Sequence, residues 1–467
     1  MKIIIIGAGK VGYALATHLS AQGNDITIID NNPKALEKVE NNLDVLPVKG
    51  TGISTSTLLE NGCQGIDLII AVTGSDEVNM LCCLTAKKLG AHRTIARIRD
   101  PQYAKELLLI KEDLGLDMVI NPEEAAADEI ARVLTVPGAI RLENFAKGRV
   151  RMVEVLLKED SPLIGTKMKH FRDKFGVSVL IGAIIREDKL IIPIGDTALE
   201  TNDTIYAIGK SAAIYTFCKR IHDKPSKVKN IMIVGGGKIT YYLARLLNEM
   251  HIKVKIIEND SAVCESLSEE LPNTLIIHGD GTDSELLAQE HLEAVDSFIA
   301  LTGRDEENII SSLIAKQSEV PRVVTKISRH YSNAVIGGLG LDTIITPHDI
   351  ITNRILKYVR GEAVEALHRI VGGKGEIIEF IASANDPLIH IPLYKLRLIP
   401  DVLIATIVKK NEIVVPNGQT MINPGDRVLV ITNKNISHLK DIMDTTSGGI
   451  TGELKNSIKK LGNIINL

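Results

Sequence analysis

The residues best suited to chemistry in this sequence are glycines near its start. Gly7, Gly9 and Gly12 have the spacing G-x-G-x-x-G and follow an apolar run at residues 3–6. Between a strand and a helix, the first glycine permits a tight turn, the second lets a phosphate approach the backbone, and the third lets the helix pack close to the strand. The N–H groups that open such a helix attract anions. The stretch therefore predicts a nucleotide-binding turn.

An acidic residue completes this pattern. Asp30 ends the next apolar segment, residues 25–29, where its carboxylate can accept hydrogen bonds from ribose hydroxyls. Because a carboxylate repels a 2′-phosphate, NADP is the least suited dinucleotide, whereas NAD, ATP, ADP and AMP remain open. A Rossmann-type turn that binds no ligand is the competing interpretation.

The same pattern occurs a second time. Residues 231–234 lead into GGGKIT at 235–240, and the next apolar segment ends at Glu258. The stretch AVTGSDEVN at 71–79 returns as ALTGRDEEN at 300–308. These correspondences indicate an internal duplication. The second copy carries Thr240 in place of Gly12, which puts a β-branched side chain at the helix–strand contact and leaves occupancy of the second copy open.

Further candidates come from the ends of other predicted strands. A glycine-rich turn at residues 49–52 should face the same crevice as Gly7, because loops at the carboxyl ends of parallel strands line one edge. Arg97 and Arg99 end the fifth strand and can pair with a phosphate or with a neighbouring carboxylate; we favour the phosphate for at least one of them. Asp76 is placed to cap a helix that runs to Lys88.

The elements that must position these residues predict an α/β fold: two tandem Rossmann-like, doubly wound parallel sheets, each followed by a small α+β module. Helices that begin at Pro122 and Pro347 follow the last strand of each sheet and have no seventh strand to reach. We expect them to cross over and pack on the other copy, the alternative being that each closes its own domain. The small modules should be stabilised by pairing, and a helical segment is predicted to start at residues 161–165.

The predicted domains are the first Rossmann domain with its crossover helix (1–140), the first small module (141–221), the second Rossmann domain with its crossover helix (228–365), the second small module (366–440) and a tail with an amphipathic helix (441–467). A polar link at residues 222–227 separates the halves.

Composition narrows the functional class. The net charge of −4, the absence of Trp and the 3% aromatic content provide neither a basic surface nor a base-stacking platform, so nucleic-acid binding is not expected. No apolar run reaches the ~18–20 residues that span a bilayer, and the start does not resemble a signal peptide. We therefore expect a cytosolic or peripheral protein. The five cysteines lack C-x-x-C spacing, which argues against disulfides and a zinc site.

The order of motifs resembles the TrkA family, the cytosolic regulatory subunits of Trk-type potassium uptake systems, built from two tandem RCK domains. The resemblance rests on GAGKVG, the KGTG turn, AVTGSDEVN, ARIRDPQYA and the module SPLIG…IPIGD…NDTIYAIG. It implies a nucleotide-gated regulator, not an enzyme, with no catalytic residues and no metal. NAD(H) or adenine nucleotides would be the ligands. The implied partners are a Trk-type membrane potassium channel subunit and further copies of the chain, in a dimer or tetrameric ring on the inner face of the cell membrane. The small modules of some relatives bind other regulators, such as cyclic dinucleotides, and nothing in this sequence identifies such a ligand.

The resemblance also implies the binding residues. In the first copy they are Gly7, Gly9, Lys10, Val11, Gly12, Asp30, Asn31, Gly50, Thr51, Thr73, Asp76, Asn79, Arg97 and Arg99. In the second copy they are Gly235, Gly237, Lys238, Glu258, Gly279, Asp280, Thr302, Asn308 and Lys326.

Two other functions compete with this one. An NAD-dependent oxidoreductase would need a general acid or base beside the nicotinamide, but the histidines, among them His18, His92 and His278, form no cluster with carboxylates at a useful spacing. A free-standing nucleotide sensor that acts on a soluble partner is the other alternative.

Overall fold

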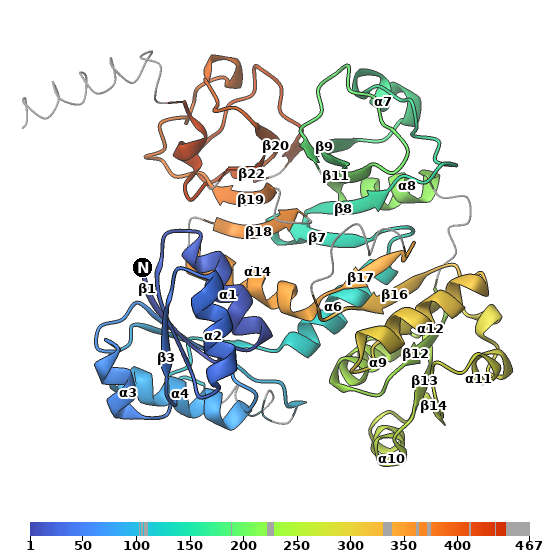
Figure 1. Ribbon diagram of the computed structural model, residues 1–467. Helices are drawn as coiled ribbons and strands as arrows, with labels where there is room; N and C mark the ends of the chain where they lie inside the picture. The colour runs from blue at the N-terminus through green and yellow to red at the C-terminus, as the bar shows by residue number, and fades with distance from the viewer. Residues whose placement is uncertain are drawn as a thin grey trace, which may run out of the picture. The chain divides into compact units, whose positions relative to one another are not determined.

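A computed structural model describes residues 1–101, 103, 106, 111–187, 189–221, 228–329, 339–360, 364–370, 375–410, 412–434 and 436–444 (Figure 1). The chain forms two compact units. The first holds Met1–Leu142, Val153–Val155 and Tyr215–Val359, and the second holds Glu143–Met152, Leu156–Ile214 and the described part of 360–467. The limits predicted for the individual domains stay a prediction.

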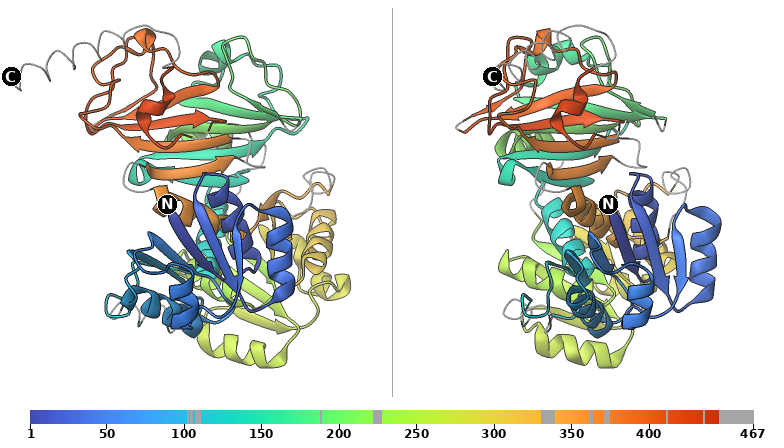
Figure 2. Two further views of the ribbon diagram at one scale, coloured as in Figure 1. Left: turned by 60° about the vertical axis from the view of Figure 1, so that its left-hand side comes forward. Right: turned by 90° about the vertical axis from the view of Figure 1, so that its left-hand side faces the viewer.

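The first unit contains two parallel six-stranded sheets of the same topology, and their strand orders are β3-β2-β1-β4-β5-β6 and β14-β13-β12-β15-β16-β17. We call each sheet with its helices a lobe. Helices cover both faces of the first sheet (Figure 2). The strand order is the Rossmann order, so the predicted fold class is confirmed.

The first lobe consists of β1 (Lys2–Ile6), α1 (Lys10–Ser20), β2 (Asp25–Asp30), α2 (Pro33–Asn42), β3 (Leu46–Lys49), α3 (Thr55–Glu60), β4 (Leu68–Ala71), α4 (Asp76–Lys88), β5 (Arg93–Arg97), β6 (Met118–Ile120) and α6 (Pro122–Leu134). The second consists of β12 (Asn230–Val234), α9 (Lys238–Glu249), β13 (Lys253–Glu258), α10 (Ser261–Glu270), β14 (Leu275–His278), α11 (Ser284–Gln289), η2 (Leu292–Ala294), β15 (Ser297–Ala300), α12 (Asp305–Gln317), β16 (Val323–Lys326), β17 (Thr343–Ile345) and α14 (Pro347–Arg360).

The central strand β1 shows why these sheets form. Its four isoleucines are all buried because helices pack on both faces, which is the burial typical of a parallel sheet. On one face Ile4 and Ile6 join a core with Cys82 and Cys83 of α4. The buried thiols are unpaired, as predicted from the cysteine spacing.

Short polar side chains set the starts of the helices. The Asn121 side-chain oxygen accepts hydrogen bonds from the backbone N–H groups of Glu123 and Glu124, and Pro122 occupies the first helical position of α6. At α4 the prediction was wrong, because Ser75 and not Asp76 is the cap. The Ser75 hydroxyl accepts a hydrogen bond from Val78 N–H. Ser75 precedes the first helical residue, so its side chain can bond to an N–H group of the first turn.

The crossover helix α6 packs on α9 of the second lobe, which confirms its predicted partner. Their contact includes a hydrogen bond of 2.8 Å from the Asn121 amide to the Tyr242 hydroxyl, which itself donates to the Arg99 carbonyl at 3.3 Å. Burial raises the pKa of Tyr242 to about 12. The contact between the two lobes therefore includes helices α6 and α9.

Tyr242→Phe removes only a hydroxyl from this contact and should lower the free energy of unfolding by about 1 kcal/mol, the usual net value of a neutral hydrogen bond. Urea unfolding of the full chain measures this change, with Tyr241→Phe on the same helix as the control. An equal effect of both substitutions would show that the Tyr242 hydroxyl does not stabilise the lobe contact.

Most of two antiparallel five-stranded sheets, with the orders β10-β9-β11-β8-β7 and β18-β19-β22-β20-β21, belongs to the second unit. Their elements are β7 (Arg141–Phe145), η1 (Ala146–Gly148), β8 (Val150–Leu156), α7 (Met168–Phe175), β9 (Val179–Arg186), β10 (Lys189–Ile191), β11 (Thr204–Lys210), α8 (Ser211–Ile221), β18 (Val364–Ile370), β19 (Gly375–Ile381), η4 (Leu393–Lys395), β20 (Val402–Val408), β21 (Ile413–Val414), β22 (Arg427–Thr432) and η5 (Leu439–Ile442).

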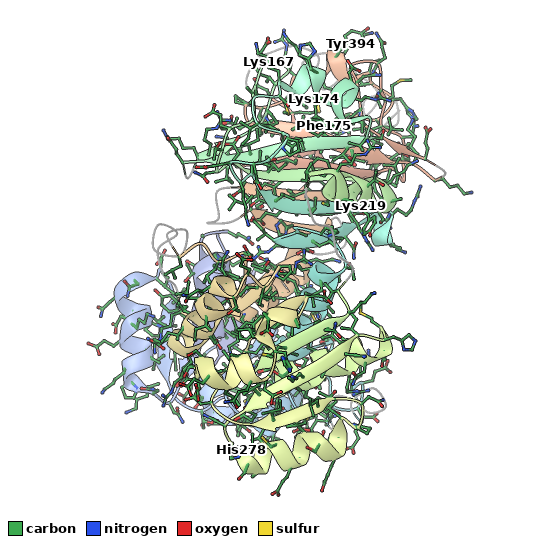
Figure 3. The ribbon with its side chains drawn as sticks, turned by 90° about the vertical axis from the view of Figure 1, so that its right-hand side faces the viewer. Lys167, Lys174, Phe175, Lys219, His278 and Tyr394 are labelled. Atoms are coloured by element: carbon green, nitrogen blue, oxygen red, sulfur yellow. The ribbon has the colours of Figure 1, made fainter. Side chains whose placement is uncertain are left out.

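One hydrophobic core joins both small modules, with Tyr206 and Ile208 of the first beside Leu429 and Ile431 of the second. The modules are thus paired, as predicted. The helix expected at residues 161–165 begins later, at Met168, because Pro162 and Gly165 form turns. Helix α7 ends at Phe175, and the Lys174 ammonium group lies 5.3 Å from the Phe175 ring centre (Figure 3).

The predicted polar link at 222–227 and the amphipathic tail helix lie outside the described residues, apart from residues 441–444 of the tail. None of the helices in the described part of the chain combines the length and the apolar character that crossing a bilayer requires.

Candidate nucleotide-binding site

The glycines of the first turn play three different parts. Gly7 has a φ of +105°, and a Cβ there would lie 3.0 Å from Thr73 N, so the tight turn requires glycine. A Cβ on Gly12 would lie 1.8 Å from the Gly7 oxygen, which leaves no room for any side chain. A Cβ on Gly9 would meet nothing within 4 Å. Gly9 therefore keeps the approach to the α1 N-terminus open, and the other two glycines shape it.

Asp30 holds this turn in place from the end of β2. Its carboxylate accepts hydrogen bonds from Ala8 N–H at 2.6 Å and from Asn32 N–H at 2.8 Å. Gly50, in the predicted second glycine-rich turn, donates its N–H to the Asp30 carbonyl at 3.0 Å. The two turns thus lie side by side, as expected for loops at the carboxyl ends of neighbouring parallel strands.

Two predicted binding residues form hydrogen bonds to the loops around the site. Asn79 is fully buried and accepts from Thr73 N–H at 2.8 Å, while its amide donates to the Arg97 carbonyl at 2.8 Å. Asp76, 6% exposed, accepts from the N–H groups of Arg99 and Asp100. Neither residue lines the cavity that these loops surround. Their geometry assigns them the positioning of the loops after β4 and β5.

The two arginines bend back over the same loop. Arg97 Nη2 donates to the Thr73 carbonyl at 2.8 Å, and Arg99 Nη2 donates to the Gly74 carbonyl at 2.5 Å. Arg99 Nε also lies 3.7 Å from Asp76 Oδ1. Burial lowers the pKa of Arg97, and neighbouring Arg99 lowers it further. Arg97 Nε is buried without a hydrogen-bond partner among the described residues. An anion beside Arg97 would stabilise its buried positive charge and could accept a hydrogen bond from Nε.

These loops surround a cavity of about 980 Å³, at the upper end of the ~300–1,000 Å³ usual for ligand pockets. Predicted residues that line it are Gly7, Gly9, Lys10, Val11, Asp30, Asn31, Gly50, Thr51, Thr73, Arg97, Arg99 and Lys326. Gly12, Asp76 and Asn79 lie outside its lining, as do the second-copy candidates other than Lys326.

Several lining residues, from α6 and from the second lobe, were not predicted from the sequence. They are Pro122 and Glu123 at the start of α6, and Ile239, Ser328, Pro347 and His348. Glu123 follows the last strand of the first sheet, so the rule that placed Gly50 at this edge could also have found it. Burial raises the pKa of Glu123, against the opposing influence of Arg99 and Arg97. No local signal could have revealed the second-lobe residues.

The second copy repeats the framework of the first. The Glu258 carboxylate accepts from Gly236 N–H at 2.5 Å, Asn308 accepts from Thr302 N–H at 2.7 Å, and Gly279 N–H donates to the Glu258 carbonyl at 2.8 Å. Gly235 has a φ of +99°, and a Cβ on Gly237 would meet nothing within 4 Å.

Other second-copy candidates are engaged differently. Thr240 donates its hydroxyl to the Gly235 carbonyl at 2.5 Å. Asp280 accepts from Thr282, and this hydrogen bonding lowers the pKa of Asp280. Lys238 pairs with Asp100 of the first lobe at 3.4 Å. Lys238 thus contacts the first lobe, and Lys326 lines the cavity of that lobe.

The cavity suits binding of an anion more than bond chemistry. The lining combines cationic side chains with the open N-terminus of α1. Among the described residues, no group of three or more His, Cys, Asp or Glu could hold a metal ion.

His278 lies near α10 in Figure 3, with Nε2 3.1 Å from the Asn259 carbonyl.

Comparison with known proteins identifies the family. The TrkA-N domain matches residues 3–122 and 231–347, and the TrkA-C domain matches 152–222 and 377–444. The chain is 36% identical over 441 residues to Trk system potassium uptake protein TrkA homolog 1 of Methanosarcina mazei, covering 92% of this chain and 97% of the relative. The chain belongs to the TrkA family. TrkA of Haemophilus influenzae is 33% identical over 457 residues, covering 96% and 99% of the two chains.

Solved structures agree with the fold of this TrkA family member. The RCK domain of GsuK has a TM-score of 0.60 and 18% identity and covers 92% of each chain. The GsuK channel bound to NAD also has a TM-score of 0.60, with 17% identity, and covers 92% of this chain and 76% of the channel chain. The tandem RCK architecture predicted from the sequence is thereby confirmed. The TrkA family member has a regulatory role in potassium transport and is not an enzyme.

Proposed function

We propose that this chain is the nucleotide-sensing regulatory subunit of a Trk-type potassium channel, bound to the channel subunit at the inner face of the cell membrane. Its ligand is an adenine nucleotide or NAD(H), bound in the first-lobe cavity. The observation that carries the proposal is the cavity itself, where Gly9 leaves the α1 N-terminus open between Asp30 and the cationic side chains. The NAD bound to the GsuK channel supports the choice of ligand.

Ligand binding would act by shifting the equilibrium between two shapes of the regulator. A ligand shifts such an equilibrium only by its difference in affinity for the two shapes, and a change from 1:99 to 99:1 needs a difference of about 10⁴-fold. Several copies of the chain in a dimer or tetrameric ring would divide this requirement among several sites. The N-terminus of α6 lies at the cavity and α6 also contacts α9, so α6 is the element proposed to carry the change.

Potassium flux tests the gating step. The channel subunit in proteoliposomes, with the regulator added outside, should show a flux that depends on ATP, ADP, AMP or NAD. A flux that is the same with and without each nucleotide would refute gating. A regulator that is recovered with soluble proteins and without the channel subunit would instead favour the free-standing sensor.

Asp30→Ala should weaken NAD and adenine nucleotide binding by about tenfold, because the carboxylate that accepts from ribose hydroxyls is lost. The affinity ratio of NADP to NAD should rise, because the repulsion of a 2′-phosphate disappears. Calorimetric titration with NAD, NADP, ATP, ADP and AMP measures both the loss of affinity and the change in the ratio of NADP to NAD affinity. Glu258→Ala is the matched variant in the second copy, and a loss of binding sites there would show that the second copy is also occupied. An unchanged affinity in Asp30→Ala would exclude ribose recognition by Asp30.

A further inference from the structure

The second small module presents an apolar segment at its surface. Residues 391–399, with the sequence IPLYKLRLI, are all described, and each of them is at least partly exposed. Tyr394 is 60% exposed and lies at the surface in Figure 3. Met421, which is 43% exposed, pairs with Pro392 and so lies beside this segment. We call residues 391–399 together with Met421 the apolar patch; contiguous exposed apolar surface of this kind marks an interaction site.

The first small module has a charged helix in the equivalent place. Backbone hydrogen bonds show the equivalence. Lys169 N–H donates to the Gly195 carbonyl at 2.9 Å, at the start of α7. Tyr394 N–H likewise donates to the Gly418 carbonyl at 2.9 Å, within η4. Helix α7 shields its module with residues that are exposed and polar, namely Lys169, His170, Arg172, Asp173 and Lys174. The second module, in its described residues, has only the three-residue η4 there.

The described part of the chain ends beside the apolar patch. Met443 forms an antiparallel bridge with Leu398, and Asp444 N–H donates to the Arg397 carbonyl at 2.9 Å. The chain therefore points toward Tyr394 where its description ends. Residues 445–453 contain three glycines and can span up to about 30 Å when extended. The residues that follow them can thus reach any part of the patch.

The sequence after this connection has the pattern that such a patch requires. Four apolar residues are spaced by four, three and four positions and would share one face of a helix; they are Leu454, Ile458, Leu461 and Ile465. Asn456 and Lys459 would lie on the opposite face. A helix of about 14 residues is marginal in water by itself, so it needs an apolar surface to pack on. The match to the TrkA-C domain ends at residue 444, so this segment is an addition to that domain.

We propose that residues 453–466 form a helix whose apolar face packs on the apolar patch of the same chain, as a cover for the place that α7 occupies in the first module. The segment follows directly from the strand pairing beside the patch, which favours its own module over a second copy. Its three lysines and one glutamate give less positive charge than the cluster of about 4–8 basic residues typical of lipid-binding segments. The inference goes beyond the proposed function and does not depend on it.

Amide hydrogen exchange of the full chain, measured by mass spectrometry, tests this docking. The amides of residues 453–466 should exchange at least about tenfold more slowly in the wild type than in Ile458→Asp, which puts a charge into the apolar face. Tyr394→Asp alters the patch and should release the segment to the same degree. Two controls should exchange like the wild type. Asn456→Asp adds the same charge to the opposite helix face, and Ile194→Asp adds it at a residue of the first module that is 72% exposed.

Other results would overturn the docking. A wild-type segment that exchanges as fast as the segment of Ile458→Asp is not docked, and protection that survives Tyr394→Asp would mean that the segment packs elsewhere. Protection that appears only with vesicles of phosphatidylcholine and phosphatidylserine in equal amounts would identify a membrane as the partner. Protection that rises with protein concentration would identify a second copy. The unfolding temperature shows whether each variant is folded, and Tyr394→Ser replaces Tyr394→Asp if that variant is not.

Discussion

Gly12→Ala is expected to destabilise the first lobe by about 3 kcal/mol or more and to abolish its nucleotide binding. The new Cβ would lie 1.8 Å from the Gly7 oxygen, which belongs to the turn that receives the ligand. Alanine is favoured over glycine in a helix by only about 1 kcal/mol, so the overlap decides the sign. Either the turn or α1 must move, and both form the anion site.

Gly9→Ala is the matched control because its Cβ would enter open space. This variant should keep the stability of the wild type and lose nucleotide affinity, since the added methyl group occupies the path of the phosphate. Urea unfolding and calorimetry together measure both quantities. If Gly12→Ala unfolded at the wild-type urea concentration, the close contact between α1 and the turn would be disproved.

The second copy shows how a side chain can be accepted at this position. Thr240 takes the place of Gly12, and its hydroxyl donates to the Gly235 carbonyl. In the second copy a β-branched residue thus bonds to the turn at the position where the first copy has glycine. Whether the second turn holds a nucleotide stays a prediction, which the Glu258→Ala titration tests.

Arg322→Met should lower the free energy of unfolding of the first unit by about 3–6 kcal/mol, because two hydrogen bonds from a buried charged group are lost at about 1.5–3 kcal/mol each. Arg322 lies in the second lobe and is 8% exposed. Its guanidinium donates to the Val133 carbonyl at 3.0 Å and to the Val136 carbonyl at 2.5 Å, at the end of α6. Burial lowers its pKa to about 10, so it remains charged at pH 7 and interacts favourably with the helix C-terminus.

Arg93→Met provides the comparison in the first lobe. Arg93 begins β5 as Arg322 precedes β16, and its guanidinium lies 5.4 Å from the ring centre of Tyr358 near the end of α14. This half-buried contact should contribute about 1 kcal/mol. Chemical unfolding of both variants measures how much free energy of unfolding each one loses. Similar losses for Arg93→Met and Arg322→Met would contradict a special role of Arg322 in holding α6.

Residues that act on neighbours in the chain could be predicted from the sequence. The turn around Gly7 and Gly9 needs glycine for local steric reasons, and Asp30 lies at a strand end that apolar periodicity reveals. The cap of α4 was misassigned by one residue, because Ser75 and Asp76 are both good caps and only the backbone angles distinguish them.

The neighbouring residues in the sequence do not show whether a polar side chain faces a ligand or supports a loop. Asn79 and Asp76 were predicted as binding residues, and the structure shows their side chains bonded to the backbone of the loop after β5. Both residues lie at the start of a helix beside the crevice, where either direction is compatible with the spacing. The packing of α4 against β5 decides the direction.

The sequence by itself determined the duplication, the strand order class and the glycine turns, because repeats, periodicity and steric demands depend on short stretches of the chain. The tertiary structure alone decided which cavity Lys326 lines. Lys326 belongs by sequence to the second crevice and by structure to the wall of the first, more than 300 residues from Gly9. That assignment depends on how two folded surfaces pack, and surfaces exist only after the chain has folded.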